Sequence, residues 1–439
     1  MKWVLTVLFS LFPGVALASS GMPSIGPVRL EFILFALTLV GVATFHKQTM
    51  YVALTGFVAI VSIKYIFVGD FSLLHHIIGG NGAEGEWRVL LNLLGLLFGF
   101  AILAKHFEES KLPDLMPNFL PDDWKGGLVL LALICIMSSF LDNIAAAMIG
   151  GTIALAVFKG KVHLGFLAAI VAASNAGGAP SVVGDTTTTL MWIDGVNPLD
   201  VTHAAVAAVS SLLIVGILGA RQQHAYQPIV QGRVEVKVEW RRLGIVFLIL
   251  VSAIATNYLF DFPALGVWAA ILIGASFSKT PWGELKNAWR GTVFLMALIA
   301  SASLMPVEEL PPATPWTAFG LGFVSAVFDN IPLTKLCLDQ GGYDWGILAY
   351  TVGFGGSMIW FGSSAGVALS NKFPEAKDTF KYLKHGWHVT LAYVLSFFIM
   401  WGIVGWNPHA PHKKSLEANR TIEATANPAE AATSAPAAK

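Results

Sequence analysis

The chain has 439 residues, of which 55% are hydrophobic and 12% charged, with equal numbers of basic and acidic residues. Soluble domains carry about 25% charged residues, so this composition excludes an ordinary soluble domain and indicates a polytopic membrane protein. The balanced charge offers no basic surface for nucleic acid. Cys135 and Cys337 both lie in apolar stretches, which favours small buried core residues over a disulfide or a metal site.

The N-terminus has a charged start, a short apolar run and an Ala-x-Ala pattern at residues 16–18. This pattern predicts a cleavable signal peptide over residues 1–18, which places the following residues outside the cytoplasm. Residues 407–439 are rich in Ala, Pro, Ser, Thr and Glu and have no apolar period, so we expect a disordered tail. Apolar segments between these ends lie at 28–45, 50–68, 88–104, 126–158, 164–192, 202–220, 243–260, 264–277, 291–305, 314–339, 346–371 and 386–406.

The segment 126–158 is too long for one crossing, since about 20 residues suffice, and Asp142-Asn143 lies at its middle. A later segment carries Asp329-Asn330 in the same way. If both segments enter and leave on one side, as helical hairpins with the Asp-Asn pairs at their tips, every inside loop contains Lys or Arg and the outside loops contain none. This distribution follows the positive-inside rule, so we predict two re-entrant hairpins.

The two hairpins then enter from opposite sides of the membrane. We therefore predict an all-α polytopic membrane protein with two inverted-topology repeats, each with a re-entrant helical hairpin and an interrupted transmembrane helix. Such repeats place a substrate site near the bilayer midplane. The predicted order is N-terminal transmembrane helices at 28–68, repeat 1 at 88–220, a cytoplasmic linker at 221–242, an additional helical pair at 243–277 and repeat 2 at 291–406.

Each repeat contains the pattern Gly-Gly-x5-Gly inside an apolar segment. Paired glycines weaken a helix, and a proline removes an amide and clashes with the preceding turn, so we expect the first helix to break within 174–180. A glycine-rich packing kink is the alternative, and the duplication argues against it. The predicted hinge residues are Gly177, Gly178, Pro180, Gly184, Gly355, Gly356 and Gly362.

Unwound backbone at membrane depth persists only where it is buried or lines a wet cavity. Oxygen atoms suit hard cations such as sodium, although half-helix N-termini also favour an anion, so the residues alone leave the sign of the substrate open. The side-chain oxygens of the first break come from Ser174, Asn175, Asp185, Thr186 and Thr187.

Asp142 and Asp329 are carboxylates in apolar surroundings, where they are retained mainly for ion or proton handling. A carboxylate that holds either a sodium ion or a proton releases one when it binds the other. The alternative is that each Asp caps the second hairpin helix, and capping is compatible with ion binding. Asn143 and Asn330 are predicted either to cross-link the hairpin tips or to bind the ion.

The two copies differ in charge. Asp185 in the first corresponds to Ser363 in the second, and Thr186 corresponds to Ser364. We therefore predict that the first copy binds a cation more strongly and with a greater dependence on pH. Lys335, in the returning arm of the second hairpin, is predicted to snorkel to the interface or to form a structural ion pair.

At these residues the chain resembles the NhaD-type sodium/proton antiporters of the ion transporter superfamily, over about residues 90–400. The resemblance rests on Leu141-Asp142-Asn143, Asn175-Ala-Gly-Gly-Ala, Gly184-Asp185-x-Thr-Thr-Thr before Leu190-Met-Trp-Ile, Phe328-Asp329-Asn330-Ile-Pro-Leu-Thr, and Gly355-Gly-Ser before Gly362-Ser-x-Ala-Gly.

The resemblance implies inverted repeats with hairpins and interrupted helices, often in a homodimer. It also implies exchange of sodium or lithium for protons, without a cofactor. The matching positions to which it gives a role are Asp142, Asn143, Asn175, Asp185, Thr186, Thr187, Asp329, Asn330, Ser363 and Ser364.

Three hypotheses follow. The first is a multi-pass cation/proton antiporter of the bacterial inner membrane, which is not an enzyme and whose partners are sodium, protons and membrane lipid. The second is a sodium-coupled carrier for citrate or another dicarboxylate, which the fixed carboxylates and the lack of a mid-membrane arginine disfavour. The third, a membrane sensor or scaffold that transports nothing, does not require paired interrupted helices.

Overall fold

The computed structural model describes residues 22–25, 28–45, 47–80, 83–230 and 234–410. The predicted signal peptide and residues 411–439 of the predicted tail lie outside the described residues. Helices dominate the described part of the chain. Its strands form two short antiparallel ribbons, β1 (Ser24–Ile25) with β2 (Val28–Arg29) and β3 (Gly79–Gly80) with β4 (Ala83–Glu84).

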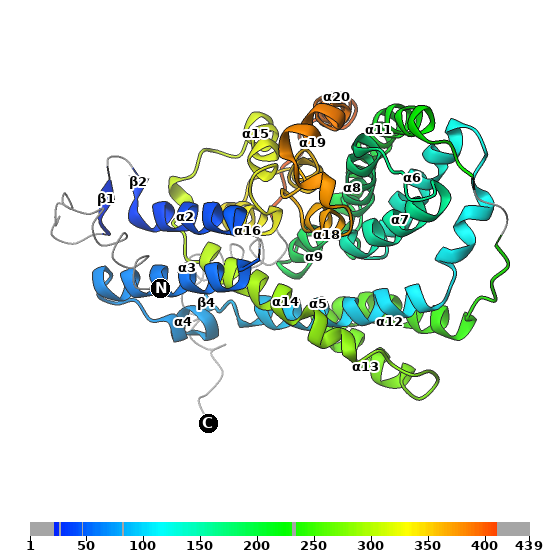
Figure 1. Ribbon diagram of the computed structural model, residues 1–439. Helices are drawn as coiled ribbons and strands as arrows, with labels where there is room; N and C mark the ends of the chain where they lie inside the picture. Colours follow the sequence, from blue (N-terminus) through cyan, green and yellow to red (C-terminus); the bar gives the residue numbers. More distant parts are fainter. Residues whose placement is uncertain (1–21, 26–27, 46, 81–82, 231–233, 411–439) are drawn as a thin grey trace.

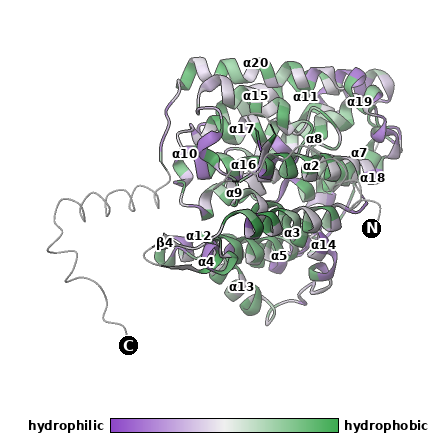
Figure 2. Ribbon diagram, turned by 90° about the vertical axis from the view of Figure 1, so that its left-hand side faces the viewer, coloured by the Kyte–Doolittle hydropathy of each residue, from purple (hydrophilic) through white to green (hydrophobic). Residues whose placement is uncertain are grey.

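The helices are arranged in two layers, which Figures 1 and 2 show from two directions. In the first layer, α14 packs against both α3 and α5, and α12 and α13 pack on α5. The first layer consists of α2 (Leu30–Thr44), α3 (Thr49–Phe67), α4 (Leu73–Ile78), α5 (Trp87–Glu109), α12 (Trp240–Phe260), α13 (Pro263–Gly274) and α14 (Gly283–Ala302).

The second layer is built around α8, which is buried along its length and packs against α6, α7 and α11. The 3-10 helices η1 (Pro113–Phe119), η2 (Val307–Glu309) and η3 (Pro374–Lys377) lie in connecting segments. The second layer consists of α6 (Trp124–Ser138), α7 (Asn143–Val157), α8 (Leu164–Gly178), α9 (Thr186–Ile193), α10 (Pro198–Thr202), α11 (Ala204–Tyr226), α15 (Pro315–Ser325), α16 (Asn330–Gln340), α17 (Trp345–Gly355), α18 (Ser364–Lys372), α19 (Thr379–His385) and α20 (Trp387–Val404).

Hydrophobic residues predominate along the helices of both layers (Figure 2), and many large ones are exposed. On α12, for example, Phe247, Ile254 and Tyr258 are exposed, as expected for a face in contact with lipid. Within the described residues, the segments α3, α5, α10–α11, α12 and α20 are long and apolar enough to cross a membrane by length and composition. The protein is thus an all-α polytopic membrane protein, and its shorter apolar helices are mostly hairpin arms and half-helices.

The same order of elements occurs twice in the chain. α5, the pair α6–α7, the interrupted pair α8–α9 and α11 correspond to α14, the pair α15–α16, the interrupted pair α17–α18 and α20. The repeats are interlocked, because α7 packs against α18 and α9 packs against α16. Each returning hairpin arm therefore contacts a half-helix of the other repeat.

The loops predicted to lie inside meet at one end of the molecule. The linker after α11 returns to this end, where the amide of Val230 donates to the carbonyl of Val157 and the amide of Glu239 donates to the carbonyl of Ser110. The two ends of the α6–α7 hairpin lie here, next to Lys125 and Lys159. We call this the inside end, following the positive-inside rule.

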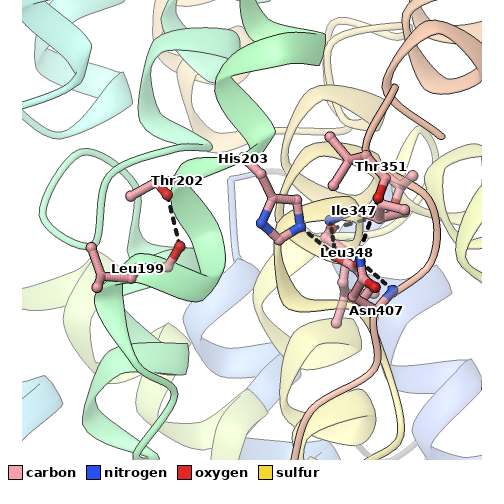
Figure 3. A network of polar contacts seen from close by, with 9 residues as sticks. Leu199, Thr202, His203, Ile347, Leu348, Thr351 and Asn407 are labelled. Carbon is pink, nitrogen blue, oxygen red and sulfur yellow. Dashed lines mark hydrogen bonds and ion pairs between the residues drawn. The ribbon is translucent and has the colours of Figure 1, made fainter. Parts of the chain in front are cut away.

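The loops predicted to lie outside meet at the opposite end. His203, before α11, approaches the N-terminus of α17, where its Nε2 lies 2.6 Å from Oδ1 of the buried Asp344 (Figure 3). The same carboxylate accepts hydrogen bonds from the amides of Ile347 and Asn407, each at 2.9 Å. Asp344 therefore joins both repeats to the segment after α20, and the first residues of the predicted tail are held against the second layer.

The first interrupted helix breaks at the end of the segment in which the sequence predicts it. α8 continues through Gly177 and Gly178 and breaks only from Ala179, which lies within the predicted 174–180. The glycines instead permit close packing, since a Cβ at Gly177 would collide with the carbonyl oxygen of Cys135 in α6. Gly355 in α17 meets Gly322 of α15 in the same way, so each interrupted helix packs tightly on its own hairpin.

Candidate cation site

A cavity of about 670 Å³ lies between the two layers. Its walls come from α5 and α14 on one side and from α7 and α9 on the other. It extends from Lys105 and Lys372, at the inside end, to the tip of the first hairpin. Three of the predicted site residues line it there: Asp142, Asp185 and Thr186.

Asp142 and Asp185 stand at equivalent places, the N-termini of α7 and α9. Neither makes a cap hydrogen bond of standard geometry, although the amides of Asn143 and Ile144 lie close to the carboxylate of Asp142 and those of Thr186 and Thr187 lie close to that of Asp185. Oδ1 of Asp142 and Oδ2 of Asp185 are buried and have no hydrogen-bond partner among the described residues. The helix N-termini favour negative charge at both positions. Each carboxylate therefore presents an unsatisfied oxygen that can accept a cation or a proton.

Asn143 and Asn175 connect this site to the second repeat. The side-chain amide of Asn143 donates to Oδ1 of Asp185 at 3.0 Å and to Oδ1 of Asn175 at 2.9 Å. The amide of Asn175 in turn donates to Oγ of Ser357 at 2.8 Å. These two hydrogen bonds are of the kind that the predicted cross-linking role of Asn143 requires.

Ser357 was not predicted as a site residue. It is fully buried in the break between α17 and α18 and completes a hydrogen-bonded chain from the carboxylate of Asp185 to the second repeat. The available sequence signal was its position directly after the double glycine of the second copy. Its hydrogen bond with Asn175, 182 residues away in the chain, forms only because the two interrupted helices cross.

The corresponding residues of the second repeat are used as helix caps. Oδ1 of Asp329 accepts from the amide of Ile331 at 3.0 Å, and Oγ of Ser363 accepts from the amide of Gly366 at 3.2 Å. Asn330 and Ser364 adjoin these caps and, like them, do not line the cavity. The asymmetry therefore extends beyond the loss of a charge, because the first copy leaves both carboxylates uncapped and the second uses both equivalents as caps.

Of the oxygen ligands predicted in the first break, Ser174 and Thr187 do not line the cavity, and neither does Asn175. The hydroxyl of Ser174 donates to the carbonyl of Val171 within α8 at 2.9 Å. Thr187 is fully buried in the first turn of α9, whereas the preceding Thr186 lines the cavity. The structure thus groups Thr186 with the two carboxylates on the surface of the cavity. Thr187 is buried behind this surface, next to the carboxylate of Asp185.

Two further threonines hold the first break in place. The hydroxyl of Thr188 donates to the carbonyl of Ser181, and that of Thr189 donates to the carbonyl of Val182 at 2.8 Å. These bonds satisfy carbonyls that the interrupted helix leaves free. They also fix the segment that carries Asp185 against the start of α9.

The cavity lining is rich in acidic side chains. It contains the carboxylates of Glu108, Asp114, Asp142, Asp185 and Glu284, and the ammonium groups of Lys105 and Lys372, but no arginine among its described residues. Both lysines lie at the inside end, and Lys105 is paired with Glu108 at 2.8 Å. A cavity with this excess of carboxylates concentrates cations. The described residues contain no group of three or more His, Cys, Asp or Glu side chains that could hold a metal ion.

Comparison with known proteins finds relatives that are transporters. The chain is 27% identical to Sodium/proton antiporter 1 of Arabidopsis thaliana, over 68% of this chain and 58% of the relative. It is 25% identical to the Na⁺/H⁺ antiporter NhaD of Halomonas elongata, over 60% of this chain and 64% of the relative, and 26% identical to NhaD of Vibrio cholerae, over 70% and 77%. The matched region thus spans less than two thirds of the first two relatives.

The relatives confirm the resemblance to NhaD-type antiporters that the duplicated motifs indicated. The citrate transporter family, CitMHS, matches residues 32–355, which include both hairpins and the first interrupted helix. Since this match covers more than half of the sequence, the chain belongs to the CitMHS citrate transporter family.

Proposed function

We propose that the protein is a secondary transporter that exchanges sodium, or lithium, for protons across the membrane. Asp142 and Asp185 hold the cation and the proton in turn, and Thr186 supplies a further oxygen. The names of the bacterial and plant relatives, all sodium/proton antiporters, support this proposal.

The observation that carries the proposal is the pair of unsatisfied carboxylate oxygens beside a cavity that opens to one side. A buried carboxylate without a partner is costly, so it is retained where a ligand supplies what the protein does not. Sodium is a hard cation and prefers oxygen ligands. A proton neutralises the same oxygens, and the two ligands therefore compete for Asp142 and Asp185.

This competition is the minimum chemistry of exchange, and no chemical conversion or cofactor is needed. When sodium enters from one side it displaces protons, and when protons enter from the other side they displace sodium. Asp329 and Ser363 act mainly as caps in this scheme, because their oxygens already accept helix amides. Asn143 and Asn175 transmit the state of Asp185 to the second repeat through Ser357.

Sodium-coupled uptake of citrate or another dicarboxylate is the second candidate, because the matching family is described as citrate transporters. The lining of the cavity disfavours it. A polyanion needs several donors, yet the residues at the hairpin tip are carboxylates and both lysines of the lining lie at the inside end. A like charge facing a carboxylate substrate costs several kcal/mol, of order 2–5.

The deciding experiment uses the purified protein in liposomes that enclose a pH-sensitive dye. Sodium, lithium, potassium and citrate are added separately, and proton movement is recorded. We expect proton movement with sodium and lithium but none with citrate. The sodium concentration for half-maximal exchange should rise as the pH falls, because protons compete for the same carboxylates.

Asp185→Asn removes the negative charge and keeps an oxygen and the approximate volume, so we expect it to abolish sodium-dependent proton movement. The control is Asp122→Asn, a change at an exposed aspartate of the loop before α6. Full exchange in Asp185→Asn, or citrate uptake driven by a sodium gradient in the unaltered protein, would contradict the proposal.

The same proposal includes the setting of the protein. We place it in the bacterial inner membrane, in contact with lipid along the exposed apolar faces of both layers, and as a homodimer. Cross-linking in native membranes measures the number of subunits, and a protein that remains a monomer there would remove the dimer from the proposal.

A further inference from the structure

A buried cluster of charged groups lies at the outside end. The ammonium group of Lys335, in α16, lies 2.8 Å from Oδ1 of Asp339, 3.0 Å from Oε2 of Glu86 and 3.6 Å from Oδ1 of Asp194. The side chain of Lys335 is 1% exposed. The sequence-based expectation of a structural ion pair is thus met, and snorkelling to water is not. A buried ammonium surrounded in this way is stabilised only by its partners.

The three carboxylates do not belong to the same layer. Asp339 lies in α16 and Asp194 follows α9, so both belong to the second layer with Lys335. Glu86 precedes α5 and belongs to the first layer. The Glu86–Lys335 pair therefore crosses the interface between the layers, whereas the other two contacts lie within one layer.

Few ion pairs cross between the layers in the described part of the chain. The Arg242–Glu109 and Lys64–Glu31 pairs lie within the first layer. Arg29 pairs with Glu309, which lies in the connecting helix η2. The Glu86–Lys335 pair is thus the direct charged link between α5 and the hairpin of the second repeat.

The same interface is closed at the outside end and open at the inside end. At the inside end the cavity separates α5 and α14 from α7 and α9, and it reaches Asp142 and Asp185. Toward the outside end, α5 packs against α9 and α14 packs against α16. A cation that comes from outside must pass between these helices, where Glu86 and Lys335 meet.

Lys335 is also linked to the tip of the second hairpin. It follows Asp329 by six residues in one helix, a distance of about 9 Å at 1.5 Å per residue. Because α16 is a single helix, a displacement of Lys335 also displaces the tip at Asp329. α16 packs against α9, which begins at Asp185, so movement at the outside interface also reaches the cation site.

We propose that Glu86 and Lys335 form a latch that holds the outside pathway closed. Lys335 remains paired with Asp194 and Asp339 after it separates from Glu86. The latch can then open without leaving a buried ammonium unpaired, which would cost several kcal/mol. The inference rests on the proposed transport function, since it assumes that the site is exposed to each side in turn.

The test measures which side of the membrane reaches the cavity. Cys135 and Cys337 are replaced by Ser, and Ala145, which lines the cavity, is replaced by Cys. Inside-out vesicles are treated with a membrane-impermeant maleimide. Glu86→Gln preserves size but removes the charge at the latch, so we expect labelling at position 145 to slow by roughly tenfold as the outside-open form becomes populated.

Asp339→Asn is the matched control, because it weakens a contact of Lys335 within one layer and leaves Glu86 in place. Because Asp339 also pairs with Lys335 in the open form, its loss should not slow labelling, and position 145 should be labelled at least as fast as in the protein with both charges. Glu86→Asp keeps the charge but shortens the reach by one methylene, and an intermediate rate is expected. It also serves as the second variant if Glu86→Gln does not fold.

Unchanged labelling in both Glu86 variants would overturn the latch, as would an equal loss in Asp339→Asn. Labelling needs no sodium or proton movement, so the latch and the transport proposal fail separately. If Glu86→Gln slows labelling but liposomes show no sodium-dependent proton movement, the latch stands and the proposed cargo is wrong.

Discussion

Asp142 and Asp329 occupy the same position in the two hairpins, but their contacts predict opposite consequences when each is replaced by alanine. Asp142 makes no cap bond and has a buried oxygen without a partner among the described residues. Asp329 accepts a hydrogen bond from the amide of Ile331 at 3.0 Å. We expect Asp142→Ala to affect exchange and Asp329→Ala to affect stability.

The magnitudes follow from these contacts. Loss of a capping Asp costs about 1 kcal/mol, within a range of about 0.5–2, so Asp329→Ala should lower the free energy of unfolding by that amount. An unsatisfied buried oxygen costs about 1–3 kcal/mol, and Asp142→Ala removes one without losing a cap. Its free energy of unfolding should therefore stay level or rise, by about 1 kcal/mol. The two variants should therefore differ by about 1–2 kcal/mol in their free energy of unfolding.

Two assays on the same preparations separate the effects. Thermal unfolding in detergent, followed through tryptophan fluorescence, ranks the stability of both variants against the unaltered protein. Proton release on addition of sodium to inside-out vesicles measures exchange. Asp142→Ala should unfold at the same temperature or higher and have no exchange, while Asp329→Ala should unfold at a lower temperature and retain exchange.

If Asp142→Ala lowers the unfolding temperature as much as Asp329→Ala does, the difference in capping has no effect on stability. If Asp329→Ala abolishes exchange while Asp142→Ala retains it, Asp329 and not Asp142 is the exchanging carboxylate. Asp329→Asn is the internal check, since Asn caps a helix about as well as Asp and should restore the stability lost in Asp329→Ala.

Two further predictions concern the contacts that join the repeats. Asp344→Ala removes the acceptor of three donors from a fully buried site and should lower the free energy of unfolding by about 3 kcal/mol, with a smaller loss for Asp344→Asn, as measured by thermal unfolding. Ser357→Ala leaves the amide of Asn175 without its acceptor, which should lower the free energy of unfolding by about 1–3 kcal/mol and weaken sodium-dependent exchange. Ser357→Thr keeps the hydroxyl and should retain most of the stability and most of the exchange. Equal losses in the two variants would count against a role for the hydrogen bond.

The two hairpins could be predicted from the sequence because the bilayer constrains the length of apolar segments and the side on which charged residues lie. Apolar length sets the number of crossings, and the distribution of Lys and Arg sets their direction. Asp142 and Asp329 fall in the non-helical turns of α6–α7 and α15–α16, as the positions of the Asp-Asn pairs in these segments predicted. These features are local or depend on each loop separately, so a single sequence contains them.

The residue at which the first interrupted helix breaks was less predictable. Two glycines suggested that the helix should stop early, but α8 continues through Gly177 and Gly178 because each removes a Cβ where another backbone approaches. A glycine that permits packing and a glycine that ends a helix look alike in sequence. The position of the neighbouring chain distinguishes them, and that position is set by the fold.

The membrane setting, the doubled architecture and the candidate carboxylates could be predicted because hydropathy, loop charge and motif spacing are properties of the chain. The packing of the helices sets which of the paired aspartates caps a helix, and it brings Lys335 to Glu86 across the two layers. Such choices depend on distances of about 3 Å between residues that are far apart in the chain, and these distances are fixed only when the helices pack.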